Sequence, residues 1–149
     1  QSGMSEQERE EFLQEFEKER DETFVGFCVM GGIFSEGIDL KADRLIGVVI
    51  VGTGLPMVCT EQELLKGYFE KTNQKGFDYA YQYPGMNKVM QAAGRVIRTM
   101  EDEGIILLLD DRFLKREYQE LFPREWPHQI VNRENVGKAI RDFWKERKR

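Results

Sequence analysis

The stretch Ile46 to Thr53, with the sequence IGVVIVGT, indicates the fold because it is a short run of β-branched, apolar residues that ends at a turn signal. Two similar runs are IILLLD over residues 105–110 and TFVGFCVM over residues 23–30, which stops at two glycines. Such runs are typical of strands buried in a parallel sheet. We therefore expect strands at 24–30, 46–53 and 105–110.

Amphipathic segments alternate with these strands. Ser5-Glu6-Gln7-Glu8 and Thr60-Glu61-Gln62-Glu63 have the pattern of capping boxes, and they predict a helix over 5–19 and another from residue 60 onward. Pro84 predicts the start of a third helix. Two more helices are expected at 114–121 and 134–147, with a short strand near 129–131. The alternation predicts an α/β fold for the single domain 1–149, with a parallel sheet covered by helices on both faces.

The helix after Pro84 carries a core stripe and a charged face. At about 100° per residue, one arc holds six apolar side chains: Met86, Val89, Met90, Ala93, Ile97 and Met100. Gln91, Arg95 and Arg98 fall on the opposite side, within about 60°. Two guanidinium groups in a row suit phosphate oxygens, which they bind with forked donors. A solvated helix face explains the same pattern without any ligand.

An acidic turn follows the first expected strand. Ser35-Glu36-Gly37-Ile38-Asp39 would lie outside the carboxyl end of strand 24–30, where ligands bind in open α/β sheets. A carboxylate there suits a ribose hydroxyl, although an ordinary polar loop also fits. Gly32 and Gly37 have the spacing of a phosphate loop, but Ile38-Asp39 follows where that loop requires Lys-Ser/Thr. The segment is therefore not a Walker A motif.

Several other features bear on partners. The net charge of −5 arises from residues 5–22, which carry −6, so the remainder carries about +1 by subtraction. Basic residues end the chain from Lys138 onward and favour either a soluble tail or phosphate contact. The residues 75–83 are expected to form a loop whose aromatic side chains either stack on DNA bases or pack as a half-buried segment: Phe77, Tyr79, Tyr81 and Tyr83.

The order of these motifs resembles the second motor domain of XPD/DinG-type superfamily 2 DNA helicases. The resemblance rests on GIFSEGIDL (32–40), GLP (54–56), QAAGRVIR (91–98) and LLDDRF (108–113), and it extends over roughly residues 5–147. It implies a RecA-like sheet that is truncated at its N-terminal edge. The domain with the Walker motifs would lie elsewhere in a longer polypeptide.

The resemblance also implies residue roles. Ser35 to Asp39 match motif V, in which Glu36, Gly37 and Asp39 would bind ATP and Ser35 would contact DNA. Gln91, Gly94, Arg95 and Arg98 match motif VI, whose arginines act jointly on a triphosphate held by the first motor domain. Tyr81 and Tyr83 are our further candidates for DNA contact, and Asp110, Asp111 and Arg112 match a less diagnostic segment.

The implied cofactor is ATP with Mg²⁺, bound mainly by the first motor domain, and the implied partners are that domain and single-stranded DNA. The resemblance allows an iron–sulfur module in the whole protein, but Cys28 and Cys59 cannot supply the four thiolates of a cluster, and no metal site is expected in this chain. Since no apolar run approaches the roughly 18 residues of a membrane span and no signal peptide is evident, we expect a cytoplasmic, bacterial protein without membrane contact. Two alternatives remain: a nucleotide- or DNA-binding module without turnover, and the motor of a DinG-like helicase-nuclease.

Overall fold

The computed structural model describes residues 3–32, 34, 45–97 and 102–147. At its centre are two parallel strands, β1 (Gly47–Val51) and β2 (Ile105–Leu109), in register from Gly47 opposite Ile105 to Val51 opposite Leu109. Their β-branched and leucine side chains suit a pleated, half-buried surface. The two strands predicted around these positions and their parallel pairing are therefore confirmed, with slightly shorter bounds.

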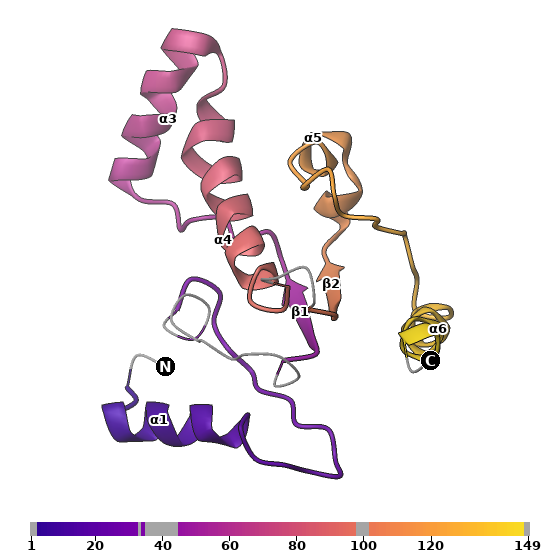
Figure 1. Cartoon of the computed structure of the whole chain (residues 1–149). Helices are drawn as coiled ribbons and strands as arrows, with labels where there is room; N and C mark the ends of the chain where they lie inside the picture. Colours follow the sequence, from indigo (N-terminus) through magenta and orange to yellow (C-terminus); the bar gives the residue numbers. More distant parts are fainter. Residues whose placement is uncertain (1–2, 33, 35–44, 98–101, 148–149) are drawn as a thin grey trace.

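The helix α4 (Tyr83–Ala93) lies between the two strands along the chain and covers one face of the sheet (Figure 1). It packs on Ile50 of β1 in a core that includes Phe113 and Tyr118. Four of the predicted stripe residues take part, three buried and the last partly buried: Met86, Val89, Ala93 and Met90. The predicted stripe is wrong at Ile97, which is 42% exposed, because the helix ends before it. Met100 lies outside the described residues.

The first turn of α4 meets the carboxyl end of β1 at two glycines. A methyl group on Gly85 would stand 2.6 Å from the carbonyl oxygen of Thr53, and one on Gly54 would stand 2.8 Å from the carbonyl oxygen of Gly85. Gly54 also has a φ of +64°, which only glycine adopts without strain. From this contact α4 runs back toward the amino end of β1.

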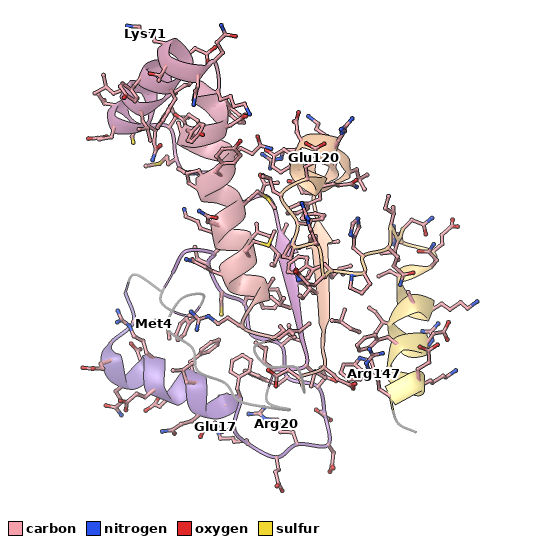
Figure 2. The ribbon with its side chains drawn as sticks, turned by 45° about the horizontal axis from the view of Figure 1, so that its top comes forward. Met4, Glu17, Arg20, Lys71, Glu120 and Arg147 are labelled. Carbon is pink, nitrogen blue, oxygen red and sulfur yellow. The ribbon has the colours of Figure 1, made fainter. Side chains whose placement is uncertain are left out.

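The helix α3 (Thr60–Asn73) and α4 form a hairpin that projects beyond the sheet, with Lys71 near its far end (Figures 1 and 2). Where a loop over 75–83 was expected, the chain forms helical turns and the π-helix η2 (Asp78–Gln82). The loop prediction is wrong because the aromatic side chains pack on one another, with Phe69 of α3 stacked on Tyr79 at 4.3 Å between ring centroids.

The two predicted capping boxes differ in outcome. At α1 (Glu6–Glu15) the box is confirmed, since Ser5 Oγ accepts from the Glu8 amide at 3.3 Å and Glu8 Oε2 accepts from the Ser5 amide at 2.7 Å. At α3 the prediction is wrong, because Cys59 is the N-cap and makes no side-chain cap bond. Thr60 is already the first helical residue there, so its hydroxyl is one position too late.

Residues 24–29 have no regular secondary structure and Met30 lies in a turn, which corrects the strand expected at 24–30. Val25 and Phe27 are 64% and 92% exposed, while Gly26 lies against the ring of Phe16, the residue after α1, and Met30 reaches the core. Residues with high β propensity become a strand only when a neighbouring strand supplies hydrogen bonds. No ladder joins this segment to β1 within the described structure.

The chain after β2 is only partly helical before its last helix. The expected helix at 114–121 is replaced by the 3₁₀ turn η3 (Asp111–Leu114) and the short helix α5 (Arg116–Gln119), and no strand forms at 129–131. The helix predicted at 134–147 is confirmed as α6 (Val136–Arg147). It lies to the outer side of β2, and Arg147 reaches back to Glu103 at 3.3 Å (Figure 2).

One face of the sheet stays open in the described part of the chain, contrary to the expected cover on both faces. Val49 and Val51 are 58% and 72% exposed, and Leu109 is 46% exposed. The apolar side chains Phe143 and Trp144 of α6 are half-buried. Among the helices within the described ranges, none has the length and apolar character needed to cross a bilayer.

Candidate functional site

Arg95 lies just beyond the end of α4, on a tight turn. The Gly94 amide still makes a helical bond to the Met90 carbonyl at 2.8 Å, but the Arg95 and Val96 amides donate three residues back, at 3.2 and 3.1 Å. The direction of the Arg95 side chain is therefore set by this turn and not by the helical wheel used in the sequence analysis. Arg95 is half-buried, while Gly94 is exposed. Gln91, one turn earlier on α4, is also exposed.

The turn is attached to the amino edge of the sheet. Val96 is 5% exposed and lies against Gly104, the residue before β2, and the Ile105 amide donates to the Ile46 carbonyl at 3.1 Å. Since α4 runs antiparallel to β1, its last residues reach the end of the sheet where both strands begin. Arg95 thus lies at the amino edge, whereas the sequence analysis placed the candidate site at a carboxyl edge.

The predicted site residues of the acidic segment lie outside the described residues, as does Arg98. Those acidic-segment positions are Ser35, Glu36, Gly37 and Asp39. Phe34 and Leu45, which flank the undescribed stretch 35–44, are described: Phe34 is buried, and both pack in a cluster with Phe12 of α1 and Phe16, the residue after α1. Leu45 is followed by Ile46 at the amino edge. The convergence of Asp39 with the arginines stays a prediction.

The two tyrosines predicted to contact DNA have different surroundings. Tyr81 is 5% exposed, stacks on Phe77 at 5.5 Å between ring centroids, and donates its hydroxyl to Glu63 Oε1 at 2.6 Å. This packing leaves its ring no open face for a base, so we reassign Tyr81 to the core of the hairpin. Tyr83 is half-buried and packs edge-on against Tyr79, which is 38% exposed.

Asp110 and Arg112 form an ion pair at the opposite, carboxyl edge of the sheet. The guanidinium donates to both carboxylate oxygens, at 2.8 and 2.7 Å, and Asp110 also accepts from the Arg112 amide at 2.9 Å. These bonds hold the pKa of Asp110 down at about 2. The pair begins η3 and thereby directs Phe113 into the core, which is a structural role.

No group of three or more metal-ligating side chains comes together in the ranges that the structure describes. Cys28 is exposed and Cys59 half-buried, and neither is in a disulfide. Gly104 and Val96 were not among the residues predicted for the site, and the one sequence signal for them is a glycine directly before an apolar strand. Val96 lies on the turn that carries Arg95 and contacts Gly104.

The chain is similar in sequence to known helicases. The family described as helicase C-terminal domain matches residues 1–129. ATP-dependent DNA helicase YoaA of Haemophilus influenzae is 30% identical over 131 residues, which is 86% of this chain and 19% of that protein. A regulator of telomere elongation helicase 1 homolog of Caenorhabditis elegans is 30% identical over 132 residues, covering 80% of this chain and 13% of that protein. ATP-dependent DNA helicase DinG of Photobacterium profundum is 34% identical over 89 residues, covering 58% and 13% respectively.

Because the family match covers most of its length, the chain belongs to the helicase C-terminal domain family. Its relatives confirm the resemblance to XPD/DinG-type helicases. The chain spans only 13–19% of the length of these three relatives.

Proposed function

We propose that this chain is the second, RecA-like motor domain of an ATP-dependent DNA helicase. A first motor domain in the same polypeptide would hold ATP with Mg²⁺, and hydrolysis would move the two domains along single-stranded DNA. Family membership and the names of the relatives support this proposal. The alternation of parallel strands with α4 is compatible with it.

The observation that carries the proposal is the position of Arg95. It lies half-buried on a short turn at the amino edge of the sheet, and Ile46, which follows Asp39 of the acidic segment by seven residues, lies at the same edge. A side chain held on a packed turn loses little further freedom when it meets a ligand, which favours a defined contact with phosphate. A guanidinium group offers forked donors that match the oxygens of a phosphate.

Each candidate residue has a proposed role. Arg95 and Arg98 contact the triphosphate of ATP and stabilise the charge that develops as the γ-phosphate is transferred. The remaining positions of the nucleotide contact are Gln91, Gly94, Glu36, Gly37 and Asp39. For single-stranded DNA we keep Ser35 and Tyr83 and replace Tyr81 by its exposed neighbour Tyr79.

The test compares Arg95→Ala with a matched control in the full-length polypeptide. Arg95→Ala should lower the turnover number of ATP hydrolysis by on the order of 10³-fold while single-stranded DNA binding is largely kept. Arg95→Lys should recover little, because lysine lacks the forked donors. Arg124→Ala removes the same charge from an exposed position after α5 and should leave turnover unchanged. Normal turnover together with weakened DNA binding in Arg95→Ala would overturn the proposal.

A further inference from the structure

Gly104 occupies a junction between the turn that carries Arg95 and the amino edge of the sheet. A methyl group on Gly104 would stand 2.2 Å from Cγ1 of Val96 and 3.1 Å from the carbonyl oxygen of Ile46. The first distance is far below van der Waals contact, so Val96 fills the space that a side chain at position 104 would need. Three segments meet there: the end of α4, the start of β2 and the residues that enter β1.

Space, and not backbone conformation, requires glycine at this position. The glycines with positive φ in the described chain are Gly31, Gly52 and Gly54, and Gly104 is not among them. Alanine could therefore adopt the backbone conformation of residue 104 without strain. A substitution there therefore tests mainly the contact with Val96, with a smaller effect from the Ile46 carbonyl.

Val96 cannot easily move away from an added methyl group. Its side chain is branched at Cβ, which restricts rotation about χ1, and the residue is 5% exposed in a packed environment. The remaining way to relieve the clash is to move the backbone of the turn. Since Arg95 is the preceding residue on that turn, its guanidinium would move as well.

We propose that Gly104 is a positioning residue for Arg95: the absence of a side chain at 104 lets Val96 fit against the start of β2, and this contact fixes where Arg95 points. The inference rests on the proposed role of Arg95 at the triphosphate. It adds that the alignment of the arginine depends on a contact on the far side of the turn, with residues that do not touch the nucleotide.

The experiment measures ATP turnover, KM for ATP, single-stranded DNA affinity and melting temperature in the full-length polypeptide. Gly104→Ala should lower kcat by on the order of 10²-fold, the effect expected of a misplaced catalytic group. DNA affinity should stay within about twofold of the unchanged protein, since this contact lies at the edge of the sheet away from the hairpin tyrosines proposed for DNA. The matched control is Gly67→Ala on α3, where no atom lies within 4 Å of the added methyl group, and kcat should not change.

A second substitution supplies the rescue. In the double variant Gly104→Ala with Val96→Ala, the new methyl group lies 2.2 Å from the position of the removed Cγ1, so the clash is gone and one of the two methyl groups lost from residue 96 is replaced. Only the 3.1 Å approach to the Ile46 carbonyl remains, and it needs a shift of a few tenths of an ångström. The double variant should regain most of the lost kcat, whereas Val96→Ala alone, which leaves the turn loosely held, should lose several-fold.

The outcomes separate the two proposals. If Arg95→Ala itself leaves kcat unchanged, the proposed function fails, and the positioning role fails with it. If Arg95→Ala abolishes turnover but Gly104→Ala folds and turns over normally, only the positioning role is overturned. If Gly104→Ala does not fold, Val96→Ala decides: wild-type kcat in that variant overturns the role, and a reduced kcat with normal DNA affinity supports it.

Discussion

The hydroxyl of Tyr81 donates a 2.6 Å hydrogen bond to Glu63 Oε1 and so joins η2 to α3 across the hairpin. This bond requires a protonated phenol as donor and favours an ionised carboxylate as acceptor. It raises the pKa of Tyr81 to about 12 and lowers the pKa of Glu63. The hairpin is therefore held by a polar contact as well as by stacked rings.

Tyr81→Phe should lower the melting temperature of the chain near neutral pH, because it removes this bond and keeps the ring. The difference should depend on pH. The pKa of Tyr81 is raised from 10.0, so the contribution is full below about pH 10 and is lost as the pH rises toward 12. The pKa of Glu63 is lowered from 4.5, so the contribution is full above that pH and is lost as the pH falls.

Thermal melting monitored by circular dichroism across this range checks the prediction. Tyr68→Phe is the matched control, since Tyr68 is 62% exposed and its substitution should leave the melting temperature unchanged at every pH. A difference between Tyr81→Phe and the unchanged chain that persisted undiminished near pH 12 would contradict the assignment of the bond.

The hairpin and the sheet also differ in how far the sequence predicts them. The strands β1 and β2 and the stripe Met86, Val89, Ala93 follow from local periodicity, which determines which face of an element is apolar. The stacking of Phe69 on Tyr79 depends on two segments meeting in space, which local periodicity does not show. The alternating aromatic residues of 77–83 therefore suggested a loop or a half-buried strand. The strand predicted at 24–30 is wrong for the same reason, because a strand forms only where a neighbouring strand supplies hydrogen bonds.

The candidate site was predictable in composition but not in position. Arg95 could be identified from its spacing to Gln91 and from the family resemblance. Its place at the amino edge could not, because the helical wheel assumes that α4 continues past Ala93. The helix instead ends at Ala93, and Val96 then contacts Gly104. Neither Val96 nor Gly104 belongs to a residue type that would mark a site in the sequence.

Asp110→Ala should destabilise the chain, because it removes both the cap of η3 and the partner of Arg112. Loss of the cap costs about 1 kcal/mol, and the ion pair adds only a few tenths because Arg112 is 38% exposed. Urea unfolding near neutral pH measures the free energy of unfolding. Asp111→Asn is the control and should stay within about 0.5 kcal/mol of the unchanged chain.

The contribution of the Asp110 charge should also depend on pH. Its pKa is lowered from 3.8 to about 2, so the stabilisation is full above pH 3.8 and is lost as the pH falls through 2. Asp110→Asn keeps an acceptor for the Arg112 amide and removes the charge. Its deficit in unfolding free energy should therefore shrink below pH 3.8, and a deficit that grew on acidification would argue against the ion pair.

Gly85→Ala should destabilise the junction between β1 and α4. The added methyl group would stand 2.6 Å from the carbonyl oxygen of Thr53, a backbone atom that cannot rotate away. We expect a loss of about 1–3 kcal/mol in the free energy of unfolding, as for other overpacked sites. Gly67→Ala, in an open part of α3, should instead stabilise the chain by roughly 0.5–1 kcal/mol. Urea unfolding of both variants measures the contrast, and equal effects would show that helix propensity alone decides.

The 149-residue chain by itself should not hydrolyse ATP at an appreciable rate, even with single-stranded DNA present. Arginines stabilise the transition state only when another group holds the phosphates in place, and no G-x-x-x-x-G-K-[ST] sequence occurs in this chain. Phosphate release from the purified chain, with circular dichroism as the check that it is folded, measures the rate. Steady turnover that disappeared in Arg95→Ala would mean that this chain binds and cleaves the nucleotide alone. The proposed division of the site between two motor domains would then be wrong, since the arginine would be acting on a nucleotide held within its own domain.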